Sequence, residues 1–438
     1  MKTQEPIADP CELPPRAEPL LSMPRKSALR NLATFLLGCL VVLSLPLLPQ
    51  LEKTPRILDV IGSAGIIYLG LVVFKFRLPV SVWIAGIVVV ISILLPLVSA
   101  LMLGDVARVI VCARLLLSIS GGILIAQIAV YYSQIDVLIF GIWTGAFVAM
   151  LIAFGQSLDV EVLVGMLPAD RNESAVFGVL RPSAIWGHPN AAAQVTMAAA
   201  AMIFIAKERG RHFVLLPLLM FLLIASPSYD VMLNRAPLIV SAMAGLFFSF
   251  MYGSMFLKGA AIVATAIFLS ILAFSPQSIL TDRWSGTFSG LSTNEQAYER
   301  LGAALTGLDL SFEAPFGHSD ADRSEKLMAQ AGVRAAHNGF VFAALTIGPW
   351  VTLILFGILF SVCFGLRPPA VNRHYGMTMG SISIMLLFED SIFEPSIMTL
   401  LVLTAALIFS ERSKNQHTNA VKDLCKDTNA DYSRKDLY

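Results

Sequence analysis

The sequence predicts an all-α polytopic membrane protein with about twelve transmembrane helices and a large, partly helical loop on one side of the membrane. Hydrophobic residues make up 56% of the chain and charged residues only 14%, and the mean hydropathy is +0.73, which is atypical of a soluble domain. Apolar runs recur along the chain, each long enough to cross ~30 Å of hydrocarbon at ~1.5 Å per residue. Backbone amides in lipid must be bonded within their own segment, so we expect these runs to be helices.

The predicted spans divide the chain into five parts. A polar, Pro-rich segment over 1–30 is expected to be a cytoplasmic tail, because it lacks the cleavage site of a signal peptide. The membrane region 31–275 includes a polar loop over 155–190, and a larger loop follows over 276–339. Three further spans over 340–410 precede a mixed-charge tail, 411–438, that is expected to be disordered. The spans are expected at 32–49, 57–74, 79–101, 109–131, 136–154, 191–206, 213–227, 236–252, 259–275, 340–364, 376–390 and 395–410.

The short loops predict the orientation. Basic residues gather in the loops on one side of a twelve-span count, at Lys75, Arg77, Lys258 and the cluster 207–211. Cytoplasmic loops are enriched in Lys and Arg, so both termini are expected in the cytoplasm. The loops 155–190 and 276–339 then face outward.

The loop 276–339 is too long to be a plain connector, since loops longer than ~15 residues without structure of their own are usually functional or disordered. It retains Trp284, Phe312 and Phe316, which is unlike a disordered segment. Apolar residues at helical spacing over 294–308 predict an amphipathic helix on the membrane surface or on the bundle. Pro315-Phe316-Gly317 predicts a turn after it.

Arginines on the outward side point to an anionic ligand. Arg181 and Arg300 lie in the two outward loops, and Arg235 lies at the outer end of a predicted span. An unpaired cation there is costly unless an anion meets it, and Arg114 within the fourth span raises the same question. Guanidinium groups match phosphate oxygens with two parallel hydrogen bonds and stay charged at any pH. A phosphate or pyrophosphate attached to a lipid is the ligand class that this pattern favours.

Other polar residues allow two interpretations each. His337 and Asn338 precede an apolar run, and Asn190 follows His188 and Pro189, so they either cap helices or contact substrate. Acidic side chains at the outer end of the eleventh span, Glu389, Asp390 and Glu394, are either ion-pair partners of the arginines or a general base. His318 in the large loop is a weaker candidate for substrate binding.

Four stretches together resemble the O-antigen ligase and polymerase superfamily. Arg181-Pro-Ser-Ala-Ile-Trp-Gly-His-Pro-Asn190 is similar to its R-x-S-G-x-F-G-N/H-P-N pattern, and Asn234-Arg235-Ala-Pro is similar to its S-R-G-A stretch. The family also has a loop pattern, R…P-x-G…H-N-x-Y-L…G. Similar residues here are Arg300, Pro315-Phe-Gly317-His318 and His337-Asn338-Gly-Phe-Val with Gly348. The order and the twelve-span layout agree with the family. The departures, Asn-Arg-Ala for S-R-G and Phe-Val for Y-L, affect the substrate assignment.

The resemblance implies a GT-C-type glycosyltransferase of the bacterial inner membrane with its active site facing the periplasm. Its donor would be an undecaprenyl-diphosphate-linked oligosaccharide, and neither a metal nor another cofactor is expected. Arg181, Arg235 and Arg300 would contact the pyrophosphate, His337 would take the acceptor proton, and Glu389 or Asp390 are the other candidate bases.

Within this family a polymerase of surface polysaccharide repeat units is favoured over a ligase to lipid A-core. A chain-length regulator and a flippase of the same pathway are expected partners. Nucleic acid is not an expected partner, because the net charge is only +1. A transporter or a flippase of lipid-linked glycans is the alternative outside the enzymes, but no internal repeat supports a transporter.

Overall fold

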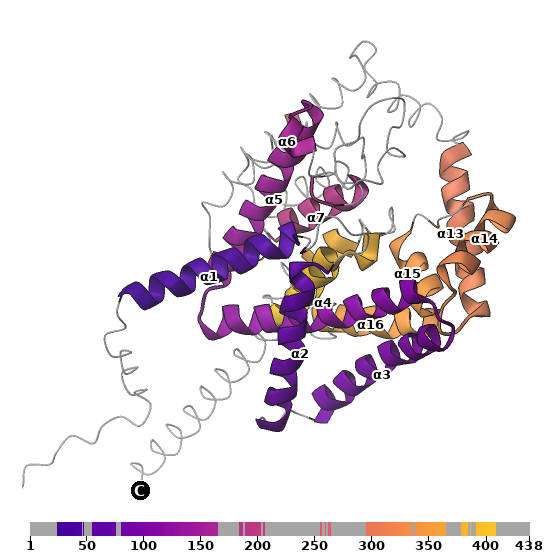
Figure 1. Ribbon diagram of the computed structural model, residues 1–438, viewed down its shortest axis with the longest axis horizontal. Helices are drawn as coiled ribbons and strands as arrows, with labels where there is room; N and C mark the ends of the chain where they lie inside the picture. Colours follow the sequence, from indigo (N-terminus) through magenta and orange to yellow (C-terminus); the bar gives the residue numbers. More distant parts are fainter. Residues whose placement is uncertain are drawn as a thin grey trace, which may run out of the picture.

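Every regular element described in the structure is a helix. A computed structural model of the chain describes residues 24–45, 47, 55–75, 80–164, 184–186, 189–202, 205, 255, 259, 262–263, 295–333, 336, 338–364, 378–383, 386 and 391–408. These residues form helices and no β-strand, which confirms the all-α prediction. The helices pack side by side, and the two helices of the large loop, α13 (Glu295–Glu313) and α14 (Asp320–Ala331), lie at one edge (Figure 1).

The first half of the chain contributes α1 (Pro24–Leu43), α2 (Ile57–Lys75), α3 (Val80–Met102), α4 (Val106–Tyr131), α5 (Ile135–Ser157), the short α6 (Glu161–Val164) and α7 (Pro189–Ala201). Helices α2 to α5 match the predicted spans within a few residues. Helix α1 begins at Pro24, inside the segment expected as a tail, and its last residue is Leu43. The spans predicted at 213–227 and 236–252 lie outside the described residues, as does most of the span at 259–275.

The second half contributes α13 (Glu295–Glu313), α14 (Asp320–Ala331), α15 (Gly339–Ile347), α16 (Pro349–Phe364), the 3-10 turn η3 (Ser391–Phe393) and a helix over Pro395–Ile408. The span predicted at 340–364 is therefore divided into α15 and α16. Gly348 has a φ of 96°, which ends α15, and Pro349 begins α16. Proline suits this first helical position because its missing N–H would have no partner there.

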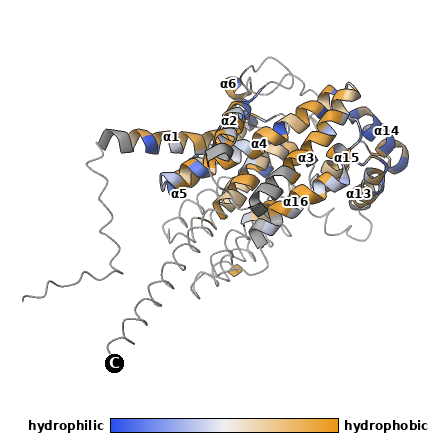
Figure 2. Cartoon of the chain, turned by 90° about the horizontal axis from the view of Figure 1, so that it is seen from below, coloured by the Kyte–Doolittle hydropathy of each residue, from blue (hydrophilic) through white to orange (hydrophobic). Residues whose placement is uncertain are grey.

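Two described helices, Val106–Tyr131 and Ile135–Gln156, are long and apolar enough to cross a membrane. Shorter apolar helices occur at Ala28–Leu43, Ile57–Leu71, Val88–Met102, Pro349–Leu359 and Pro395–Ile408. Helices α3, α4 and α16 are mostly hydrophobic along their length, whereas α14 carries many hydrophilic residues (Figure 2). The fold is compatible with a helical membrane protein.

Glycines bring two pairs of helices into backbone contact. A Cβ atom at Gly38 of α1 or at Gly141 of α5 would lie within 3 Å of the other helix's backbone, and Gly62 of α2 stands in the same relation to α4. Small residues that allow such approach are typical of helix contacts in membranes. Along α1, residues 35, 38 and 39 meet residues of rising number on α5, so the two helices run parallel.

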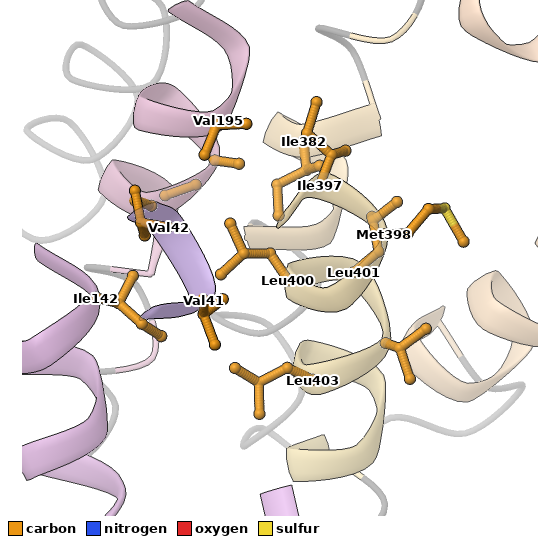
Figure 3. Packing of buried hydrophobic residues seen from close by; sticks show 14 of the residues in the cluster. Val41, Val42, Ile142, Val195, Ile382, Ile397, Met398, Leu400, Leu401 and Leu403 are labelled. Atoms are coloured by element: carbon orange, nitrogen blue, oxygen red, sulfur yellow. The ribbon is translucent and has the colours of Figure 1, made fainter. Parts of the chain in front are cut away.

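The helix over Pro395–Ile408 lies at the centre of the hydrophobic core. Leu400 and Leu403 of this helix point toward Val41 of α1 and Ile142 of α5, and Ile397 lies near Val195 of α7 (Figure 3). Two of its buried hydroxyls donate to backbone carbonyls: Thr404 to Leu400 at 2.8 Å and Ser396 to Val42 of α1 at 3.3 Å. This helix therefore contacts α1, α4 and the end of α7.

The large loop contains two helices. The predicted amphipathic helix is confirmed as α13, which extends to Glu313, and the predicted turn is confirmed by a 2.8 Å hydrogen bond from Gly317 N–H to the Ala314 carbonyl. Helix α14 was not predicted. Ser319 caps it by accepting a hydrogen bond from Asp322 N–H, and Gly332 ends it with a φ of 70°.

Candidate functional site

The structure describes some of the predicted site residues and the neighbours of others. Arg300, His318 and Asn338 are described, and Asn190 is described as part of α7 without its side chain. The remaining candidates, Arg181, His188, Arg235, His337, Glu389 and Asp390, lie outside the described residues. The site is therefore built from the segments that flank them.

The segment between Arg181 and Asn190 is held by one side chain of α5. Gln156 is fully buried, donates a hydrogen bond to the Ala184 carbonyl at 2.8 Å and accepts one from Ala184 N–H at 2.9 Å. Ala184 has a φ of 53°, a left-handed conformation that favours glycine, and it occupies the position of a glycine in the family pattern. Trp186 next to it is fully buried. Within the first motif, Ala184 is thus bonded to the end of α5.

The two halves of the loop motif meet at a pair of glycines. Gly317 and Gly348 both have positive φ values, 89° and 96°. A Cβ atom at Gly317 would collide with the Thr346 carbonyl, and one at Gly348 would collide with the Pro315 carbonyl. His318 N–H also donates to the Leu345 carbonyl at 2.7 Å. Only glycine fits both positions, so the Pro-x-Gly turn and the glycine after the His-Asn stretch form one contact.

The His318 side chain holds this turn to α13 and α14. Its ring is buried, with Nδ1 2.5 Å from Asp322 Oδ2 and Nε2 2.9 Å from the Leu310 carbonyl oxygen. Both partners of the ring, a carbonyl oxygen and a carboxylate oxygen, are hydrogen-bond acceptors. Both nitrogens are thus engaged within the loop. Substrate binding by His318 stays a prediction, and it would require one of these bonds to open.

The charges around His318 shift the pKa values of its neighbours. Burial alone would raise the pKa of Asp322, but its hydrogen bond with His318 and the nearby positive charges of His318 and Lys326 outweigh burial and lower it. A hydrogen bond to Glu313 raises the pKa of Lys326; burial opposes this rise, and the charges of Asp322 and Glu313 add to it. The loop surface therefore favours the charged forms of these groups.

Arg323 and Asn338 connect α14 and the loop end to α15. The Arg323 guanidinium donates to Thr346 Oγ1 at 2.7 Å, pairs with Asp320 and lies 4.3 Å from the centre of the Phe342 ring. Asn338 Oδ1 accepts hydrogen bonds from the N–H groups of Phe340 and Val341, at 3.0 and 3.1 Å. Asn338 is thus the N-cap of α15, one of the two roles open to it from the sequence.

A buried arginine fastens the loop to the helix bundle. Arg108 at the start of α4 is only 2% exposed. Its guanidinium donates to the Gly317 carbonyl and, at 3.1 Å, to Ser99 Oγ of α3. The Asp105 carboxylate lies 3.8 Å from its Nε. Arg108 therefore joins the α3–α4 turn to the Pro-x-Gly turn.

Two ion pairs connect helices of the bundle. Arg56 pairs with Glu394, just before the helix over Pro395–Ile408. Arg114 Nε lies 3.8 Å from Asp59 Oδ2, and Asp59 also accepts a 2.7 Å hydrogen bond from Arg56 N–H. Asp59 is thus the anion that meets Arg114. Glu394 takes the ion-pair role that was one of its two interpretations, with Arg56 as its partner.

The 3-10 turn η3 lies where the motif segments come together. It contacts α15 from the loop, α7 from the first motif, and α4. Phe393 of η3 packs on Phe342 of α15, with ring centroids 5.8 Å apart. The candidate bases Glu389 and Asp390 immediately precede η3 in the sequence. Arg300 is exposed on α13.

Comparisons with known proteins find no match: no protein-family model matches the chain, and no curated protein matches its sequence. The described residues contain no cluster of three or more His, Cys, Asp or Glu side chains that could hold a metal ion. The sequence analysis did not single out the roles of Arg108, Asp59 or Gln156. Arg108 could have been recognised by its place beside a predicted helix start, because a cation at that position needs an acceptor.

Proposed function

We propose that the chain is a glycosyltransferase of the bacterial inner membrane that acts at its periplasmic face. In this proposal twelve spans enclose a site that binds undecaprenyl-diphosphate-linked oligosaccharide and joins the repeat units into a surface polysaccharide. Neither a metal nor a nucleotide sugar takes part, because the glycosyl–diphosphate bond already carries the leaving group. A chain-length regulator and a flippase would work beside it.

One observation carries the proposal. The two halves of the loop pattern, which resembles that of the ligase and polymerase superfamily, meet through Gly317 and Gly348 at positions where a Cβ atom would collide with backbone. The spacing of the pattern therefore has a structural cause in this chain. The contact lies at the end of α15, and the start of the same helix is capped by Asn338, the residue that follows His337 in the sequence.

The chemistry requires a grip on the diphosphate and a base. Negative charge grows on the diphosphate as the glycosyl bond breaks, and arginines already in place stabilise that charge more in the transition state than in the ground state. Arg181 and Arg235 are the proposed contacts, with Arg300 as a further one. His337 would accept the proton of the attacking hydroxyl, since the unperturbed pKa of histidine suits this role near neutral pH. Single displacement would invert the anomeric carbon.

The test of the function is the length of the surface glycan in a bacterial strain that lacks the gene. Chains limited to one repeat unit, restored to full length by the wild-type gene, are expected for a polymerase. Full-length chains that stay on the lipid carrier would instead indicate a ligase. Lipid-linked repeat units that accumulate on the cytoplasmic side would indicate a flippase and contradict the proposal.

The proposed diphosphate grip has its own test. Replacing Arg181 or Arg235 by Lys keeps the charge but removes the two-pronged hydrogen bonding, so polymer yield should fall strongly at equal protein level. Wild-type yield from both variants would remove these arginines from the site.

A further inference from the structure

Helix α13 has an apolar face that packs on α15. Ala303 and Leu310 are buried on this face. Gly307 lies between them, and a Cβ atom there would lie 2.8 Å from Val341 of α15. This contact accounts for the attachment of α13 to the bundle, and it leaves the opposite side of the helix uncovered.

A second apolar face of α13 is exposed. Leu301, Leu305, Leu308 and Phe312 follow one another at intervals of four, three and four residues, so they form one line along the helix. Their exposed fractions are 57, 57, 43 and 57%. We call these four residues the α13 stripe. A contiguous exposed apolar face of this kind marks a surface that is covered by something other than water.

The α13 stripe continues onto the outward face of α16. The Phe312 ring meets the Trp350 ring edge-on, with centroids 6.2 Å apart and planes at 73°. Trp350 and Leu353, one turn apart on α16, are 58 and 65% exposed. Helix α16 is apolar from Pro349 to Phe364, with exposed Trp350 in its first turn. Tryptophan at the end of an apolar helix is typical of the boundary between lipid and water.

Charged residues lie beside the stripe and not within it. Asp309 and Glu313, four residues apart, are exposed along one edge, and Glu313 pairs with Lys326 of α14 at 3.0 Å. Helix α13 therefore has one face on the bundle, a second apolar face in line with the outward face of α16, and an acidic edge. A helix with these three faces is suited to lie in the plane of a membrane surface.

We infer that the α13 stripe is inserted into the bilayer surface, where it contacts lipid beside the first turn of α16. The lipid that surrounds α16 extends over the stripe, because the two faces are continuous through Phe312 and Trp350. The contact is apolar and its edge is acidic, so it needs no anionic lipid. Such insertion holds the loop, and with it the turn at Gly317, at a fixed height above the membrane. This inference is independent of the reaction that the protein catalyses.

The test places a nitroxide label on full-length protein in phosphatidylcholine nanodiscs, using a keto amino acid that leaves the native cysteines in place. Single labels replace Leu305, Phe312 and Leu353, with Asp309 on the same helix and Glu325 on α14 as matched exposed controls. Relaxation by oxygen, which dissolves in lipid, is compared with relaxation by a water-soluble nickel chelate. At the shallow depth of an interfacial helix, the ratio of oxygen to nickel accessibility should be roughly tenfold higher at the three apolar sites than at the controls.

Three results would overturn the inference. Nickel accessibility at Leu305 and Phe312 equal to that at Asp309 would show that the stripe faces water. Low accessibility to both reagents would show that protein covers it, either another part of this chain or a second copy. Added phosphatidylserine should leave the ratios unchanged, and a ratio that rises only with anionic lipid would also contradict the apolar contact proposed.

Discussion

Helix contacts in the bundle and in the loop are made in different ways. Helices α1 and α5 touch through glycines, backbone against backbone, with no charged group at the contact described around Gly38 and Gly141. In the loop, the His318 side chain joins α13 to α14, Arg323 joins α14 to α15, and Arg108 of α4 donates to the Gly317 carbonyl. The α1–α5 contact around these glycines thus depends on shape, whereas the contacts around the Gly317 turn also use directed polar bonds. Two of the four family-like stretches, 300–318 and 337–348, lie in the loop or at its junction with α15.

The largest expected effect separates chemistry from structure in the loop. Because Asn338 already caps α15, His337 is not required as its cap. Replacing His337 by Ala should lower glycan transfer by ~10²–10⁴-fold, the usual worth of general-base catalysis, while donor binding persists. Transfer per folded molecule is measured with purified protein and lipid-linked donor.

The control for His337 is Ser319→Ala, which removes the cap of α14. It should cost about 1 kcal/mol of stability and leave turnover per folded molecule intact. Normal turnover in His337→Asn would assign His337 to structure and shift the search for a base to Glu389 or Asp390.

The attachment of the loop to the bundle should depend on Arg108. In Arg108→Met the Gly317 carbonyl and Asp105 lose a buried charged partner, so we expect a loss of about 3 kcal/mol. Ser99→Ala removes only one of the same hydrogen bonds and should cost about 1 kcal/mol. Denaturant unfolding and proteolysis within the loop measure both. Equal stability of the two variants would show that Arg108 does not hold the loop.

The bundle should be sensitive to single methyl groups. Gly141→Ala places a Cβ atom against the Phe35 carbonyl, and forcing the helices apart should cost about 1–3 kcal/mol. The same substitution at Gly70 of α2, where no atom lies within 4 Å, should be neutral or stabilising by up to about 1 kcal/mol. Thermal unfolding in one detergent compares the two. A tolerant Gly141 would mean that shape does not govern the α1–α5 contact.

The smallest expected effect is a gain. Ala184 adopts a left-handed conformation that costs a residue with a Cβ atom about 1–2 kcal/mol. Ala184→Gly removes this strain but adds freedom to the unfolded chain, so stability should be unchanged or rise by up to about 1 kcal/mol. Thermal unfolding measures the change. A clear loss would indicate that the buried Ala184 methyl group contributes more than the backbone strain removes.

Local patterns in the sequence were sufficient for most helices. The apolar runs at 57–74, 79–101 and 109–131 correspond to α2, α3 and α4, because a run long enough to cross lipid must satisfy its backbone within a helix. The spacing of Leu301, Leu305 and Leu308 revealed α13. Helix α14 was not predicted because it is polar, and only two single residues, the Ser319 cap and Gly332, mark its ends.

Only the tertiary structure decided which residues meet. Arg56 and Glu394 are 338 positions apart, and Arg108 reaches a carbonyl 209 positions away. No rule of helix period or capping extends beyond one or two turns, so the anion that meets Arg114 was visible only once α2 and α4 were packed in register. The sequence by itself predicted the helical character of the described residues, their apolar segments and the polar loop. The folded chain showed that Gly317 and Gly348 share one contact, because two backbones can approach so closely only where neither carries a side chain.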